Sequence, residues 1–243
     1  MILYVTMENK VLLEKIDLVI DDQKMILGGA IILEDKRILD VLAYPYDKRL
    51  KNYDGKRLEL EGLIIMPNFK TLDHSKRKVL AKSELNQASI TKYHNDGYIV
   101  GLDQSNLSYD VLDTLDFDYI TNLKKYAQID LNHLNLLNYV LLNKNKYLEL
   151  SLDEVDIRML PFIINNLGVK RIIIKDKHEE AMKQLSLLGY SLNDIVAMTS
   201  LNARRLLRID HLEGTLRKGK VADLMIVKDN LDVVLKIQEG RVL

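Results

Sequence analysis

The two ends of this chain differ in texture from its middle. Residues 1–66 and the stretch after Gly214 consist of short apolar runs, such as 16–20 and 30–33, broken by charged or turn residues. Runs of this kind are typical of strands in an antiparallel sheet. In the middle, short apolar runs alternate with segments of helical spacing, which predicts parallel βα units. We therefore expect one β domain, built from both termini, interrupted by a βα domain.

Four strands are predicted in the middle segment, at residues 98–102, 119–123, 147–152 and 171–174. The segments between them have apolar residues at helical spacing. Gly97, Gly168 and Gly189 each follow such a segment. A glycine is commonly needed there because the residue after a helix often adopts a left-handed conformation.

Charge and cysteine content exclude several classes of protein. The chain has 35 basic and 35 acidic residues among its 243, so a general nucleic-acid binder is not expected. The basic runs at 76–78 and 217–220 are predicted to be solvated loops. Zero cysteines exclude disulfides and thiolate metal sites, and no window is apolar enough for a membrane span. The expectation is a soluble cytoplasmic protein that binds no membrane.

Several stretches resemble those of a known superfamily. The C-terminal stretches MTSLNARRLL and GTLRKGKVADLMIVKD, together with LELEGLIIMPNF near the start of the middle segment, are similar to stretches of the amidohydrolases. Within that superfamily, YITNLKKY, YLELSLDEVDI and RIIIKD resemble segments of the N-acetylglucosamine-6-phosphate deacetylases. The resemblance implies a (β/α) barrel with a divalent metal at the C-terminal ends of its strands, flanked by a small β-sandwich formed by both termini. In such a site a metal-activated water attacks an amide and an aspartate moves the proton.

The chain is short for that fold. About 145 residues separate the two terminal segments, whereas a complete eight-stranded barrel takes about 250. The predicted fold class is therefore α/β, with a reduced or incomplete (β/α) barrel at 63–211 and a β-sandwich made of 1–62 and 212–243. The shortage is expected mainly between Ser75 and Tyr98.

The resemblance also implies where metal ligands would stand. Asp73 and Ser75 take the positions of the first histidine pair, with His74 between them on the opposite side of the strand. Gln104 and Asn122 take the positions of two further histidines. Oxygen ligands suit hard cations, and neutral amides bind weakly. Asp73, Gln104 and Asn122 are thus predicted as vestigial metal positions that hold at most a weakly bound divalent cation, and no other cofactor is expected.

The remaining candidate residues concern catalysis and substrate. Asp176 matches the catalytic aspartate of the family, and Asp156 stands where a histidine would contact substrate. Lys124 and Lys125 replace part of the substrate loop, where they would meet a sugar phosphate. Simpler interpretations stay open: Asp176 as a strand-end acid or a helix cap, and the two lysines as solvated charges.

Three functions remain after this comparison. The first is a degenerate deacetylase-like protein, without catalysis or severely impaired, that serves in binding, regulation or as a subunit. The second is an active metal-dependent hydrolase of an amino-sugar phosphate with Asp176 as general base. The third is a binding protein for a small phosphorylated ligand. A homo-oligomer is expected as well, because an incomplete barrel exposes strand edges.

Overall fold

The computed structural model describes residues 10–21, 24–72, 74–103, 115–121, 146–153, 155 and 157–243. These residues form two compact units. The terminal unit contains the described residues up to Phe69, together with Tyr190–Val196 and Arg208–Leu243. The central unit contains the described residues of Lys70–Gly189 and Ala197–Leu207. Within the described ranges, no helix is both long and apolar enough to cross a membrane.

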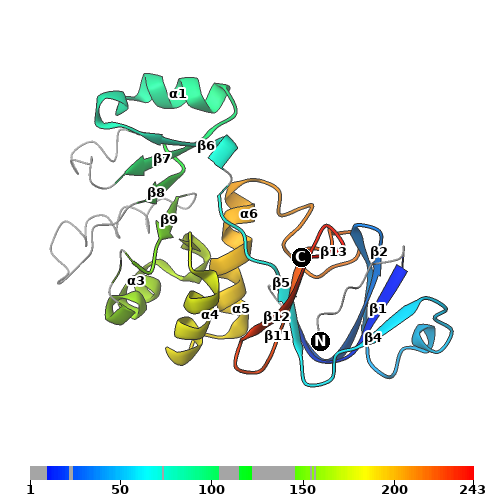
Figure 1. Ribbon diagram of the computed structural model, residues 1–243. Coiled ribbons are helices and arrows are strands. Elements are labelled where there is room, and N and C mark those ends of the chain that lie inside the picture. Colours follow the sequence, from blue (N-terminus) through cyan, green and yellow to red (C-terminus); the bar gives the residue numbers. More distant parts are fainter. Residues whose placement is uncertain are drawn as a thin grey trace. The chain divides into compact units, whose positions relative to one another are not determined.

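The terminal unit is built on one eight-stranded sheet in which strands from both ends of the chain are neighbours (Figure 1). The strands are β1 (Lys10–Ile20), β2 (Met25–Glu34), β3 (Arg37–Ala43), β4 (Lys56–Glu59), β5 (Ile64–Pro67), β11 (Leu224–Val227), β12 (Val233–Gln238) and β13 (Arg241–Val242). They run in the order β13-β12-β11-β5-β1-β2-β3, with β4 also paired to β1. β5 joins the two ends, because Ile65 pairs with Val19 of β1 in parallel and with Ile226 of β11 antiparallel.

This sheet curls until its two ends meet. Arg37 at the start of β3 forms a bridge with Val221, just before β11, and Ile38 N donates to Lys220 O over 2.8 Å. One face of the curled sheet encloses a core that includes Leu13, Ile31, Ile65, Leu224 and Ile237, each fully buried. The predicted sandwich would have two separately bonded sheets. The described strands of the terminal unit instead belong to a single curved sheet.

The central unit contains a five-stranded parallel sheet in the order β10-β9-β8-β7-β6 (Figure 1). Its strands are β6 (Arg77–Leu80), β7 (Ile99–Asp103), β8 (Tyr119–Thr121), β9 (Tyr147–Leu150) and β10 (Ile172–Ile174). The four predicted strands are confirmed, with ends that shift by one or two residues. β6 is an addition, because it lies in a stretch that was predicted to be a loop. The described residues form an open parallel sheet of the kind expected for an incomplete barrel, and no closed barrel is seen among them.

Helices follow the strands in this unit. They are α1 (Gln87–Asn95), α3 (Leu160–Leu167), α4 (His178–Leu187) and α6 (Asn202–Leu206), with α5 (Leu192–Val196) in the terminal unit and a π-helical turn at Ala197–Leu201. Single 3₁₀ turns lie at Lys48–Leu50, His74–Lys76, Lys82–Glu84, Ile157–Met159 and Val169–Arg171. The predicted left-handed glycines are confirmed, since φ is 82° at Gly97, 77° at Gly168 and 86° at Gly189.

The two faces of the parallel sheet differ sharply in chemistry. One face is aliphatic except for Lys78 at its edge, and its aliphatic residues are at most 1% exposed: Leu80, Val100, Leu102, Ile120, Leu148, Leu150, Ile172 and Ile174. α1 packs against β7, while α6 and the π-helical turn pack against β10. Register partners in a parallel sheet point to the same side, so the opposite face carries Arg77, Gly101, Asp103, Tyr119, Thr121, Tyr147 and Glu149, together with the apolar Val79, Ile99 and Ile173. Polar side chains are therefore concentrated on one face.

Candidate functional site

A cavity of about 520 Å³ lies over the polar face of the parallel sheet. Its described lining residues are Thr71, Leu72, Arg77, Val79, Glu149, Lys175 and Asp176. Strands β6 and β9 and the loop after β10 supply the charged ones. The volume falls within the range of about 300–1,000 Å³ that is usual for small-molecule sites.

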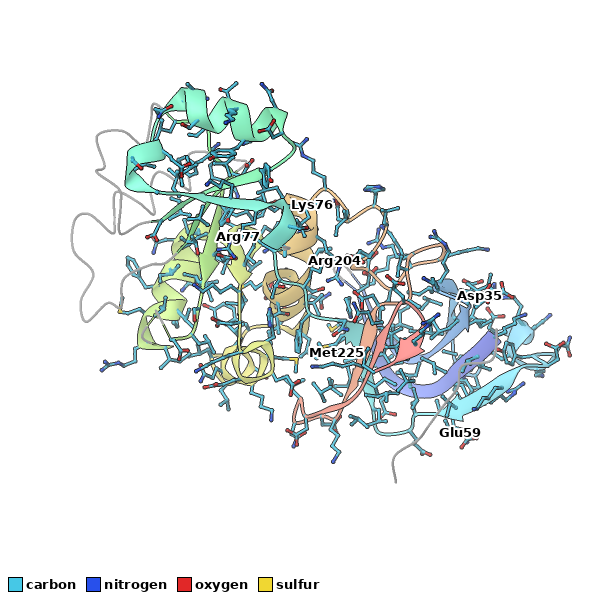
Figure 2. The ribbon with its side chains drawn as sticks, turned by 45° about the horizontal axis from the view of Figure 1, so that its top comes forward. Asp35, Glu59, Lys76, Arg77, Arg204 and Met225 are labelled. Atoms are coloured by element: carbon cyan, nitrogen blue, oxygen red, sulfur yellow. The ribbon has the colours of Figure 1, made fainter. Side chains whose placement is uncertain are left out.

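An ion pair crosses the floor of the cavity. Arg77 Nη2 donates to Glu149 Oε2 over 2.7 Å, and the side chain of Glu149 is 0% exposed. Thr121 Oγ1 donates to the same carboxylate oxygen over 2.6 Å and accepts a longer bond of 3.4 Å from Arg77 Nη2. Figure 2 shows Arg77 among the side chains of the parallel strands. The three residues come from β6, β8 and β9, so the fold itself assembles the cluster.

A tyrosine ring supports the arginine from below. The guanidinium of Arg77 lies 5.3 Å from the ring centroid of Tyr119, in a cation–π contact. The ring leaves no room for a side chain at Gly101 of β7, because a Cβ there would lie 2.3 Å from Tyr119 Cζ. Burial raises the pKa of the Tyr119 hydroxyl well above its ordinary value, and the negative charge of Glu149 adds to the rise. Tyr119 is therefore a neutral packing element beneath the cluster.

Asp176 stands at the rim of the cavity, two residues beyond β10. Ser151 Oγ donates to Asp176 Oδ1 over 2.9 Å and accepts from the backbone N–H of Asp153 over 3.2 Å. Nearby, Lys177 Nζ donates to Asp153 over 2.6 Å, and this hydrogen bond raises the pKa of Lys177. The Ser151 bond fixes one oxygen of the Asp176 carboxylate beside the cavity.

Two expectations about this region are corrected by the structure. The run at 76–78 is not a solvated loop, because Arg77 begins a strand and its side chain is only 15% exposed. Asp176 does not cap the following helix, because the N-cap position of α4 is Lys177, whose φ is 45° and whose side chain makes no capping bond. Asp176 lies between the end of β10 and Lys177, and its predicted role as general base stays a prediction.

The other predicted site residues fall outside the described ranges. These are the metal positions Asp73, Gln104 and Asn122 and the substrate positions Lys124, Lys125 and Asp156. Whether they converge on Asp176 therefore remains a prediction. Ser75, the partner position of Asp73, is described and exposed.

The described residues of the cavity do not fit a metal ion. Within the described part of the chain, no group of three or more His, Cys, Asp or Glu side chains is placed to hold one. The buried carboxylate, Glu149, is already bonded to a guanidinium, and a second cation would be repelled by Arg77. The arrangement offers hydrogen-bond acceptors and fixed charges, which suit recognition of a small polar molecule.

Comparison with known proteins places this architecture in a class. No protein-family model matches the chain, and no curated protein matches its sequence. Solved structures do match along nearly its whole length, and its fold is similar to theirs. One of them, enamidase, is described as a member of the amidohydrolase superfamily; it is 10% identical, with a TM-score of 0.69 over 96% of this chain and 95% of its own.

Within that fold, N-acetylglucosamine-6-phosphate deacetylases are among the most similar structures. The enzyme from Pasteurella multocida is 11% identical, with a TM-score of 0.79 over 96% of this chain and 99% of its own. The enzyme from Mycobacterium smegmatis is also 11% identical, with a TM-score of 0.71 over 97% of this chain and 100% of its own. The resemblance seen in the sequence is confirmed at the level of fold.

The central cluster of the site was not predicted from the sequence. No role was expected for Arg77, Thr121 or Glu149, although the last two lie in stretches that resemble the deacetylases. One signal was present: Glu149 stands between Leu148 and Leu150 in an otherwise apolar strand. A carboxylate in that setting needs a buried partner, but nothing in the local sequence identifies Arg77 as that partner.

Proposed function

We propose that this protein uses an amidohydrolase fold to bind a small polar ligand, and that it hydrolyses the ligand slowly or not at all. The observation that carries the proposal is the ion pair of Arg77 with Glu149 in the cavity floor. The guanidinium already pairs with the buried carboxylate, so Glu149 is not free to bind a metal ion that would activate water. A binding or regulatory role follows.

The ligand class comes from the similar structures. Their descriptions name N-acetylglucosamine 6-phosphate deacetylation, and a small amino-sugar phosphate suits a cavity of about 520 Å³ lined by both acidic and basic groups. The homo-oligomer and the cytoplasmic location expected from the sequence stay predictions. So do the contacts of Lys124, Lys125 and Asp156 with such a ligand.

The decisive experiment pairs a metal analysis with an activity assay. Protein purified without chelator is analysed for bound metal and assayed for deacetylation of N-acetylglucosamine 6-phosphate, with and without added zinc, manganese or magnesium. We expect less than stoichiometric metal and no turnover above background, alongside an active deacetylase of the same fold as positive control. Stoichiometric zinc with metal-dependent turnover would contradict the proposal.

A second candidate is a working hydrolase with Asp176 as general base. It is favoured by one observation, that Asp176 lines the cavity and has one oxygen held by Ser151. In this case turnover would be lost in Asp176→Asn and reduced only modestly in Ser151→Ala, since Ser151 orients the carboxylate without replacing it. Glu84→Gln, which changes a partly buried acid outside the cavity, is the matched control.

A further inference from the structure

Only one of the two carboxylate oxygens of the buried Glu149 has hydrogen-bond partners among the described residues. Its Oε2 accepts from Arg77 and Thr121, at 2.7 and 2.6 Å. Its Oε1 is buried and has no hydrogen-bond partner among the described residues. An acceptor left in this state destabilises the fold, and a charged acceptor does so more strongly than a neutral one. Glu149 Oε1 is therefore a strong hydrogen-bond acceptor for which the described residues supply no donor.

The position of Glu149 indicates where that donor comes from. Glu149 lines the cavity, whose volume of about 520 Å³ is large enough for a small organic molecule. Arg77 and Thr121 already occupy the other oxygen of the carboxylate. Oε1 is therefore the oxygen of this cavity-lining carboxylate that the described residues leave without a hydrogen bond.

We infer that Glu149 Oε1 receives a hydrogen bond from a hydroxyl or ammonium group of a small polyol or amino-polyol bound in this cavity. Asp176 at the rim supplies a second acceptor, so the ligand presents donors at more than one point. This inference rests on the proposed binding function and specifies the ligand chemistry of the same site.

The charges fix the orientation of such a ligand. An anionic group placed against Glu149 would meet a buried carboxylate whose own cation, Arg77, is already paired with it. Repulsion between like charges is strong where water is excluded. A phosphate on the ligand must therefore point away from Glu149, toward the rim where Lys175 lies. The inner end of the ligand is the end that donates hydrogen bonds.

The inference is tested by binding measurements on the full chain. Calorimetric titration uses glucosamine 6-phosphate, with inorganic phosphate as a separate probe. Glu149→Gln retains a carbonyl oxygen for Arg77 and Thr121 but places an amide donor where Oε1 stood. We expect this variant to bind the sugar at least about 10-fold more weakly, because one buried donor then faces another. Glu84→Gln, in the same unit but outside the cavity, should bind like the unaltered protein.

Several outcomes overturn the inference. They are unchanged affinity in Glu149→Gln, no saturable binding of the sugar, or inorganic phosphate that binds as tightly as the sugar and competes with it. If Glu149→Gln does not fold, a crystal structure of the unaltered protein with glucosamine 6-phosphate decides. A ligand oxygen or nitrogen within hydrogen-bond distance of Oε1 supports the inference, and an ordered water alone at that position overturns it. Turnover of substrate would contradict the proposed function while leaving the Glu149 contact intact, so the two failures are distinguishable.

Discussion

Arg77 and Glu149 make an ion pair of 2.7 Å although they lie on strands β6 and β9, with two strands between them. Neighbouring strands are about 4.8 Å apart, so a flat sheet would separate these two strands by about 14 Å. The side chains meet because both point to the same face of the sheet and together they are long enough to reach across the strands between them. The ion pair thus connects distant strands of the parallel sheet, and its loss should be felt in stability as well as in binding.

Arg77→Met should destabilise the protein strongly. It leaves the buried Glu149 carboxylate without its cation, which typically costs about 3–5 kcal/mol. The change is measured as the free energy of unfolding in urea. Lys36→Met is the matched control: it breaks an exposed pair with Glu239, in which both side chains are 60% exposed, and should cost less than about 1 kcal/mol.

The double variant Arg77→Met with Glu149→Leu should recover most of the loss, because replacing a buried pair by apolar groups is often close to neutral. Equal losses in the free energy of unfolding for Arg77→Met and Lys36→Met would show that the buried ion pair contributes no more than an exposed one.

Gly101→Ala should destabilise the parallel sheet. The added methyl would lie 2.3 Å from Cζ of Tyr119, and an overpacked core typically costs about 1–3 kcal/mol. The same substitution in a Tyr119→Ala background should cost much less, since the ring is gone. Thermal unfolding of the four proteins of this cycle gives the coupling energy. Simple additivity of the two substitutions would contradict the assigned contact.

Asn202→Ala should remove a tie between α6 and the residues around β10. Asn202 Nδ2 donates to Val169 O and to Ile172 O, each over 2.7 Å, and the residue is 0% exposed. Two buried carbonyls lose a donor, so we expect a loss of about 1–3 kcal/mol in urea unfolding. Asn166→Ala removes one exposed bond to Phe162 O and should cost less than about 0.5 kcal/mol. Similar losses at both positions would argue against the tie.

The pair of Asp116 with Lys146 should make stability depend on acidity. The hydrogen bond from Lys146 Nζ, 2.8 Å long, holds the pKa of the Asp116 carboxyl below its ordinary value. A carboxyl whose pKa is lower in the folded than in the unfolded state stabilises the fold at pH values above its unfolded-state pKa of about 3.9. This stabilisation is lost as the pH falls through the folded-state pKa.

Asp116→Asn should therefore be less stable than the unaltered protein at pH 7. The difference should be below about 1 kcal/mol, because the Asp116 side chain is 76% exposed. It should shrink as the pH drops below about 3.9. Thermal melts of both proteins between pH 7 and pH 2 check this, and a difference that grows in acid would reverse the assigned sign.

Local pattern predicted most of the strands but missed one of them. The four confirmed strands of the parallel sheet are mostly apolar, so their own residues indicate that they are buried. β6 carries Arg77 and Lys78, and its charge hides the alternation with Val79 and Leu80. What makes Arg77 suitable for a strand is Glu149, 72 positions away. A short stretch of sequence around Arg77 contains no sign of a partner that lies so far along the chain.

The site was predicted in part for the same reason. Asp176 was found because it follows an apolar run and matches a family motif. The cavity floor depends on register, which places Thr121 beside Glu149 and Gly101 beside Tyr119. Spatial neighbours across strands follow from pairing and curvature, and neither is visible in a single sequence.

The position of β5 in the terminal sheet sets an order of events during synthesis. β5 pairs with β11, which leaves the ribosome about 160 residues later. At the usual rates of about 5–20 residues per second, this takes about 8–30 s. Throughout that interval β5 can pair with β1, but its opposite edge, at Ile64–Pro67, lacks the partner that β11 supplies. A nascent chain halted before residue 224 would expose this apolar edge, so the synthesis of β11 also protects the N-terminal strands from association with other chains.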